Sequence, residues 1–156
     1  MPDRIILVGP YSVGKTTLGA QLAEELGWEF VDSDALLRRP PREVALELGE
    51  EGFRKVEEAH LLPQLARSKV VIATGGGAVE SVAIRHQLAS TRLVIHLQLD
   101  SETLWQRWLV RGLPTTAPSR AHFEAYLKRR IPLYEEVADG ACCAEDWEAL
   151  RAFCGQ

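Results

Sequence analysis

The chain has 156 residues, 46% hydrophobic and 26% charged, which suits one soluble domain and leaves too little sequence for a second. We therefore expect a single domain over residues 1–156. The formal net charge of −4 argues against a nucleic-acid-binding surface, because such surfaces carry a net basic charge. We find no apolar run long enough for a membrane span and no signal-peptide pattern, so we expect a cytoplasmic protein.

The cysteines and two of the tryptophans are expected to serve the core. Cys142, Cys143 and Cys154 lack metal-ligand spacing and have no neighbouring histidine, so we expect small buried side chains in a reducing compartment. Trp105 and Trp108 recur at helical spacing, which is more typical of core anchors than of a surface on which bases stack. Neither group indicates a site.

Strands and helices alternate along the chain. The apolar run at 4–9 predicts a buried strand, and leucines every four residues predict a helix from Thr16 to Gly27. We expect an interrupted or bent helix near Pro132 and a mobile surface loop at 111–120. The same patterns predict strands at 28–32, 69–73, 92–99 and about 141–143, and helices at 52–62, 101–110, 122–139 and 147–153. The alternation predicts right-handed crossovers and a three-layer α/β sandwich.

Residues 9–16, GPYSVGKT, match the pattern G-x-x-x-x-G-K-[ST] between a predicted strand and a predicted helix, the context that a phosphate-binding loop (P-loop) requires. Gly9 and Gly14 permit a turn whose backbone N–H groups and helix N-terminus face a phosphate. Lys15 would bridge the β- and γ-phosphates, and the Thr16 hydroxyl would bind Mg²⁺. The residues predicted to bind the nucleotide here are Gly9, Ser12, Val13, Gly14, Lys15, Thr16 and Thr17.

The P-loop alone does not identify the phosphate acceptor, because GTPases, motor ATPases and small-molecule kinases all use one. A GTPase would also carry an N-K-x-D motif, which this sequence lacks. A motor ATPase is normally longer and has an apolar strand that ends in an acidic pair, whereas the strand at 69–73 is followed by TGGG.

Two more groups of residues follow predicted strands. Gly75–Gly77 bring backbone amides to the edge of the sheet where ligands bind in open α/β folds, although a flexible turn is an alternative interpretation. Asp32 and Asp34 follow the strand at 28–32. We expect Asp32 to face the Mg²⁺ shell and Asp34 to face an acceptor hydroxyl, with a helix N-cap as the competing interpretation.

Taken together, these segments resemble the shikimate kinases. The motifs GxxxxGKT, DSD (32–34), GEEGFRKVE (49–57), TGGGAV (74–79) and RRIPLYEEVAD (129–139) occur in the order and approximate spacing of that family, over nearly the whole chain. The resemblance implies a nucleoside-monophosphate-kinase-like fold with a five-stranded parallel sheet in the order 2-3-1-4-5. It also implies transfer of the γ-phosphate of MgATP to the 3-hydroxyl of shikimate, with a substrate-binding segment at about 33–62 and a lid at about 110–121.

Residue by residue, the resemblance implies that Asp34, Arg54 and Arg130 bind the substrate, together with the glycines Gly75, Gly76 and Gly77. It also implies that Arg111 reaches the phosphates from the lid and that Arg107 stacks near adenine. Catalysis would then rest on Lys15, Asp34 and Arg111, with the metal held by Thr16 and Asp32.

Physical chemistry supports the arginine assignments, since two guanidinium forks can fix a small carboxylate in one orientation. From the residues alone, however, Arg54 could instead pair with Glu57 or Glu58 on its own helix, and Arg130 in KRR could lie on a solvated basic face. The position of both arginines in family motifs favours binding.

The sequence departs from the family pattern at three places. In the P-loop, Ser12 stands where a third glycine is usual, and YSV makes the loop bulkier. The lid reads RGLP (111–114) rather than R-P-L-L. Residues 35–48 lack part of the usual helix over the substrate. Three alternatives therefore stay open: a related kinase for another small hydroxy acid or polyol, a nucleoside or nucleotide kinase of the same fold, and a nucleotide-binding module without turnover. We expect a monomer with a small-molecule substrate and neither a nucleic-acid nor a membrane partner.

Overall fold

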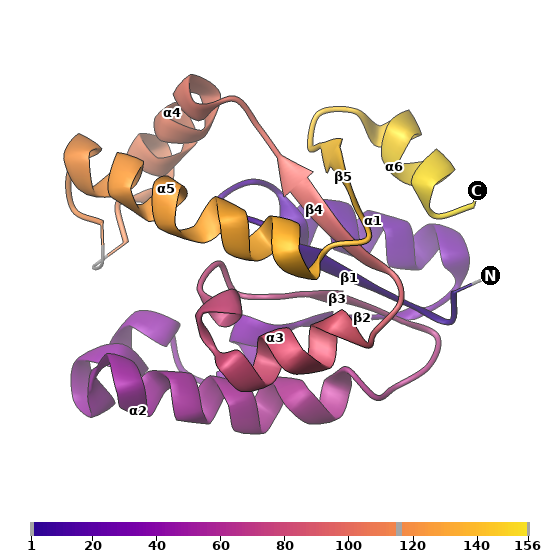
Figure 1. The fold of residues 1–156 in the computed structure, drawn as a ribbon, viewed down its shortest axis with the longest axis horizontal. Helices are drawn as coiled ribbons and strands as arrows, with labels where there is room; N and C mark the ends of the chain where they lie inside the picture. Colours follow the sequence, from indigo (N-terminus) through magenta and orange to yellow (C-terminus); the bar gives the residue numbers. More distant parts are fainter. Residues whose placement is uncertain (1, 115–116, 156) are drawn as a thin grey trace.

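The computed structural model describes residues 2–114 and 117–155. Five strands form one parallel sheet in the order β2-β3-β1-β4-β5, which confirms the expected fold class and strand order (Figure 1). The strands are β1 (Arg4–Val8), β2 (Glu29–Asp32), β3 (Val70–Ala73), β4 (Val94–Gln98) and β5 (Gly140–Cys143). The helices are α1 (Lys15–Leu26), η1 (Ser33–Leu37), α2 (Pro41–Gln64), η2 (Ala78–Glu80), α3 (Val82–Ala89), α4 (Ser101–Arg111), α5 (Arg120–Val137) and α6 (Trp147–Phe153).

The two faces of the sheet are covered by different helices. Ile5 and Leu7 of β1 point into a cluster with α1, α4, α6 and the first half of α5, whereas Ile6 and Val8 point into a cluster with α2, α3 and the second half of α5. This alternation follows from the two-residue period of a strand. Both faces of β1 are therefore buried, which explains why residues 4–9 form a continuous apolar run.

Helix α1 begins and ends as the sequence predicts. Gly27 caps its C-terminus in the left-handed conformation, with φ of 70°. Two tryptophans of α4 serve the core, as the sequence predicts. Trp108 is fully buried in the cluster that contains Ile5 and Leu7, and the half-buried Trp105 packs against that cluster. None of the helices in the described part of the chain is long and apolar enough to cross a membrane.

Three expectations need correction. Helix α5 is not interrupted at Pro132, because one missing backbone donor does not outweigh the packing of its flanking turns, which bury Tyr126, Arg130, Tyr134 and Val137. Cys143 is exposed while Cys142 and Cys154 are buried, since successive residues of the edge strand β5 face opposite sides.

The third correction concerns the start of α2. The sequence predicts a helix at 52–62, whereas α2 begins at Pro41: residues 41–48 form a helical segment that is joined to the rest of α2 at a kink at Gly49, where φ is 75°. Pro41 lies in the first turn, where proline is tolerated because that N–H has no helical partner. The lid predicted at 110–121 includes residues 115 and 116, which lie outside the described residues.

Candidate active site

The P-loop connects β1 to α1 and is shaped by its glycines. Gly9 passes so close to β4 that a Cβ atom there would lie 2.8 Å from the carbonyl oxygen of Leu97, and Gly14 has a φ of 114°. Both positions therefore require glycine. The loop ends on the N-terminus of α1, where unpaired backbone N–H groups and the helix dipole favour an anion.

Lys15 is buried in this loop. Its Nζ donates hydrogen bonds to the carbonyl oxygens of Gly9 (2.6 Å) and Pro10 (2.9 Å). Burial lowers the pKa of Lys15 to about 8, although the carboxylates of Asp34 and Asp32 act in the opposite direction. Two neutral carbonyl acceptors and two nearby carboxylates thus offset only part of the desolvation of the ammonium group.

Asp32 caps the helix that follows it, as the competing interpretation predicts, and also contacts Thr16. Its Oδ1 accepts the backbone N–H of Asp34 (3.0 Å) and so caps η1, while its Oδ2 accepts the hydroxyl of Thr16 (3.1 Å). A hydroxyl and a carboxylate side by side are hard oxygen donors that fit Mg²⁺, which keeps several waters and binds through one or two carboxylates plus phosphates. Among the described residues no group of three or more His, Cys, Asp and Glu side chains could hold a metal ion, so such an ion would depend on the nucleotide for its remaining ligands.

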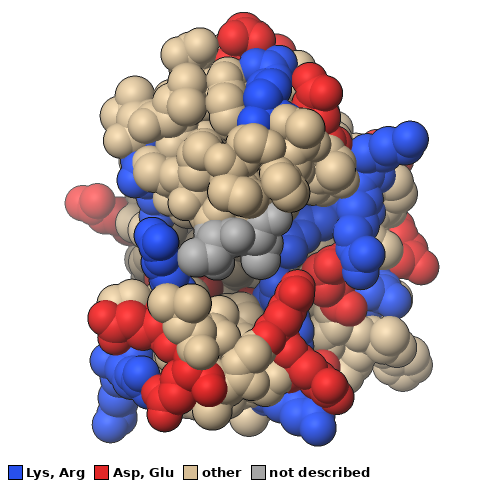
Figure 2. All heavy atoms as spheres, turned by 90° about the vertical axis from the view of Figure 1, so that its left-hand side faces the viewer, with Lys and Arg blue, Asp and Glu red and all other residues tan. Residues whose placement is uncertain are grey.

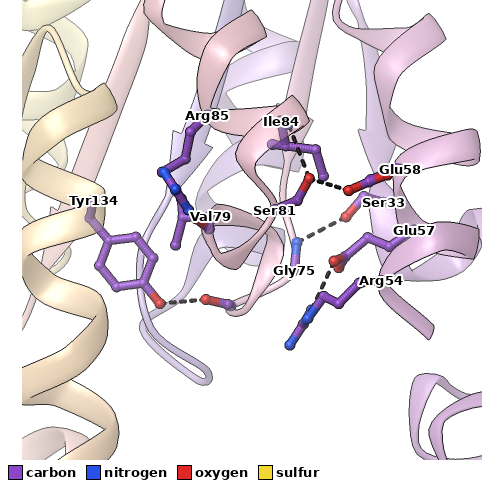
Figure 3. Close-up of polar contacts among 11 residues, drawn as sticks. Ser33, Arg54, Glu57, Glu58, Gly75, Val79, Ser81, Ile84, Arg85 and Tyr134 are labelled. Atoms are coloured by element: carbon purple, nitrogen blue, oxygen red, sulfur yellow. Dashed lines mark hydrogen bonds and ion pairs between the residues drawn. The ribbon is translucent and has the colours of Figure 1, made fainter. Parts of the chain in front are cut away.

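The glycines after β3 form a tightly held loop (Figure 3). The Gly75 N–H donates to Ser33 Oγ (2.9 Å), and the Tyr134 hydroxyl donates to the carbonyl oxygen of Gly76 (2.5 Å). An added Cβ at Gly77 would lie 2.2 Å from an Arg54 guanidinium nitrogen. The glycines are needed because side chains of the site approach their backbone closely, which a flexible turn would not require.

Arg54 is held by a carboxylate that we had named only as a competing partner. Its Nη1 lies 2.8 Å from Glu57 Oε1, and Glu57 is 4% exposed (Figure 3). Asp34 lies close by, since an added Cβ at Gly75 would be within 2.9 Å of both carboxylates. Burial raises the pKa of Glu57 and of Asp34, while the Arg54 guanidinium partly counteracts this. The signal for Glu57 was present in the sequence as a glutamate three positions after the arginine.

Arg130 does not lie on a solvated face. It is 7% exposed, and its guanidinium carbon lies 4.1 Å from the centre of the Tyr126 ring. Its neighbour Arg129 is the solvated one, paired with Glu80 on the surface. The helix period therefore separates the two arginines of KRR, which the sequence alone could not do.

The two arginines predicted near the lid both reach the P-loop. Arg107 Nη1 donates to the carbonyl oxygen of Val13 (3.1 Å), and the Arg111 guanidinium lies 4.8 Å from the centre of the Tyr11 ring. Arg107 also lies 3.8 Å from a carboxylate oxygen of Glu145.

Two cavities of about 500 and 480 Å³ meet at this edge of the sheet. Tyr11, Asp34, Gly76 and Arg111 line both. The first cavity contains the following predicted nucleotide and metal residues: Ser12, Gly14, Lys15, Thr16, Thr17, Asp32 and Arg107. The second contains the predicted acceptor residues: Asp34, Arg54, Gly75, Gly76, Gly77 and Arg130. Gly9 and Val13 line neither, since Gly9 lies against β4 and the Val13 side chain is buried in the core.

The charge distribution on this face agrees with anionic ligands. Figure 2 shows Lys and Arg side chains to the left and right of the hollow between the part of the molecule that holds α2 and the part that holds α4 and the start of α5, and Asp and Glu side chains along its lower edge. The two cavities nevertheless gather Lys15, Arg54, Arg107, Arg111 and Arg130 in a protein whose net charge is negative.

Comparison with known proteins places the chain in a family. A sequence profile described as shikimate kinase matches residues 11–152. The chain belongs to the shikimate kinase family. Shikimate kinase 1 of Yersinia enterocolitica is 39% identical over 157 residues, covering 93% of this chain and 88% of that protein, and the shikimate kinase of Vibrio campbellii is 40% identical over 152 residues with the same coverage. The structure of the shikimate kinase from Acinetobacter baumannii in complex with shikimate is 34% identical, with a TM-score of 0.83 over 91% of this chain and 83% of that chain.

Ser12 is a departure from the shikimate kinase pattern that has a structural cost. Its φ of 68° lies in the left-handed region that a glycine adopts freely, and its hydroxyl oxygen is buried without a hydrogen-bond partner among the described residues. Both features are unfavourable, so the loop holds a conformation that its own sequence disfavours.

We predict that Ser12→Gly raises the free energy of unfolding by about 1 kcal/mol, because it relieves the left-handed backbone and removes the unpaired hydroxyl. Urea titration followed by circular dichroism measures this change. Ser12→Ala is the matched control, since it removes the hydroxyl and keeps the backbone cost. Equal stability of the wild type and Ser12→Gly would contradict the prediction.

Proposed function

We propose that this protein transfers the γ-phosphate of ATP to the 3-hydroxyl of shikimate. The observation that carries the proposal is the shared wall between the P-loop cavity and a second cavity with two arginines and a half-buried aspartate. A phosphate donor on one side and a small hydroxylated carboxylate on the other would meet at that wall. Membership of the shikimate kinase family supports ATP as the donor.

The acceptor carboxylate would be bound by Arg54 and Arg130. Both guanidinium groups line the second cavity, and neither is free to move: Glu57 holds Arg54, and Arg130 is buried over Tyr126. Planar guanidinium forks held in this way favour one orientation of a carboxylate. That orientation would fix which ring hydroxyl faces the nucleotide.

Asp34 would orient the reacting hydroxyl and accept its proton. It lines both cavities, and burial raises its pKa, which makes it a better base than an exposed aspartate, while the charges of Lys15, Arg111 and Arg54 act in the opposite direction. A fixed carboxylate next to the attacking oxygen contributes through position as well as basicity.

On the donor side, Lys15 and Arg111 would neutralise the charge on the transferred phosphoryl group. Lys15 would exchange its two hydrogen bonds to neutral carbonyl oxygens for contacts with charged phosphate oxygens, and Arg111 would approach from the lid. Thr16 and Asp32 would hold Mg²⁺, which supplies further charge neutralisation when bound. The lid would exclude water from the γ-phosphate.

The proposal predicts ADP release that depends on shikimate. Purified protein with MgATP should release ADP in a coupled assay only when shikimate is present, and Lys15→Ala should lower the rate about a hundredfold or more, because a positioned charge at the transferred group is lost. Quinate, gluconate and nucleosides form the comparison panel. Turnover with one of these instead would overturn the acceptor, and ADP release with none of them would indicate a nucleotide-binding module without turnover.

The two neighbouring arginines provide a matched test of acceptor binding. Arg130→Ala should raise KM for shikimate roughly ten- to a hundredfold, since a charge-assisted hydrogen bond contributes about 1.5 to 3 kcal/mol. Arg129→Ala removes the same charge one residue away, on the solvated face, and should leave KM within about twofold. Similar effects of the two substitutions would argue that α5 contributes only a diffuse positive field.

The lowered pKa of Lys15 predicts an alkaline limb in the pH profile. Below about pH 8 the free protein carries the charged ammonium that attracts phosphate; above it, the neutral amine predominates, and binding must take up a proton. The value of kcat/KM for ATP should therefore fall about tenfold per pH unit above pH 8. Lys15→Arg keeps the charge at all these pH values, so its affinity for ATP should lack this limb. A wild-type profile that stays flat to about pH 10 would contradict the assignment.

A further inference from the structure

Tyr11 occupies one of the variable positions of the P-loop motif, yet it makes more contacts with distant elements than the chemistry of phosphate binding requires. It lines both cavities, so it lies at the wall where donor and acceptor would meet. Neither the motif nor the family comparison assigns it a role.

The backbone of Tyr11 is fixed by two aromatic residues from other helices. The Trp108 indole N–H donates to its carbonyl oxygen (2.7 Å), and its own N–H donates to the Tyr126 hydroxyl (3.1 Å). The rings of Tyr11 and Trp108 also meet edge to face at 5.5 Å. Trp108 in turn packs edge to face against Phe123 and Tyr126, so Tyr11 rests on a buried aromatic cluster.

The side chain of Tyr11 extends from this cluster to the base of the lid. Its hydroxyl donates to the carbonyl oxygen of Gly112 (3.0 Å), and the Arg111 guanidinium lies over its ring at 4.8 Å. Among residues 2–114 and 117–155, Arg111 has no salt bridge and its side chain has no hydrogen bond. Within that part of the chain, the Tyr11 ring is therefore the contact that holds the guanidinium.

We propose that Tyr11 is a positioning residue that presents the Arg111 guanidinium at the junction of the two cavities. This inference rests on the proposed function, in which Arg111 neutralises the transferred phosphoryl group. A guanidinium over an aromatic face keeps its charge and its hydrogen-bond donors, which point outward from the ring and stay available to a phosphate. The hydroxyl contact with Gly112 fixes the turn that follows Arg111, where φ of Gly112 is 110°.

The kinetic test compares three variants. Tyr11→Leu removes the aromatic face and the hydroxyl, and should lower kcat about 3- to 5-fold, in line with the strength of a cation–π contact to an exposed guanidinium. Tyr11→Phe keeps the face and should recover most of that loss. Leu109→Ala, on the same helix as Arg111 and lining neither cavity, should leave kcat unchanged.

A double-mutant cycle separates positioning from packing. If Tyr11 acts through Arg111, then Tyr11→Leu should cause no more than about a twofold further loss in the Arg111→Ala background, while it causes its full loss in the wild type. A loss of equal size in both backgrounds, or an unchanged kcat in Tyr11→Leu alone, would overturn the inference. Absence of shikimate-dependent turnover in the wild type would instead count against the proposed function.

A second readout does not depend on activity. Trypsin cleaves after arginine, so the rate of cleavage between Arg111 and Gly112 reports how firmly this turn is held. We expect cleavage there, identified by mass spectrometry, to rise about 3-fold or more in Tyr11→Leu, with cleavage after the exposed Arg38 as the internal reference. An unchanged ratio of the two cleavage rates would overturn the Tyr11–Arg111 contact even if turnover is never observed.

Discussion

The whole site depends on the order of strands in the sheet. Because β1 lies between β3 and β4, and β2 lies beside β3, the carboxyl ends of β1, β2 and β3 are adjacent at one edge. Each of these ends carries one functional segment: the P-loop after β1, Asp32 and Asp34 after β2, and the glycine loop after β3. Parallel pairing therefore places segments that are about 20 to 60 residues apart in the sequence within hydrogen-bonding distance, as in the contact between Gly75 and Ser33.

This arrangement concentrates ionisable groups that would each be unfavourable alone. Lys15, Glu57 and Arg130 are buried, and Asp34 is half-buried, so each loses hydration that its charged form requires. The opposing signs of the pKa shifts follow from this shared cause, since burial lowers the pKa of the lysine and raises that of the carboxyls. Anionic ligands would relieve the imbalance on the basic side. A site of this kind is less stable when empty than when filled, which favours tight binding of a phosphate and a carboxylate together.

The fold could be predicted from the sequence because its signals are local and strong: buried apolar runs, leucines at helical spacing, and a P-loop in its required context. The failures have a common origin in contacts between distant segments. The run KRR does not show by itself which arginine faces the core. The packing of α5 places Arg130 inward and Arg129 outward. The helix predicted at 52–62 in fact begins at Pro41, where proline is acceptable because it lies in the first turn. For Arg54 the two interpretations were not exclusive, since an ion pair with Glu57 also fixes the arginine beside the acceptor cavity.

The departures at Tyr11 and Ser12 acquire a joint explanation from the structure. A glycine at position 12 would adopt the left-handed conformation at little cost, whereas Ser12 does so against its intrinsic preference. The contacts that hold the adjacent Tyr11 backbone to Trp108 and Tyr126 supply an external constraint on the same turn. In this chain the shape of the P-loop thus depends on an aromatic cluster contributed by α4 and α5 as well as on its own glycines. Because α4 carries Trp108 and ends at Arg111, one helix both helps to shape the phosphate-binding loop and carries the residue expected to reach the phosphate from the lid.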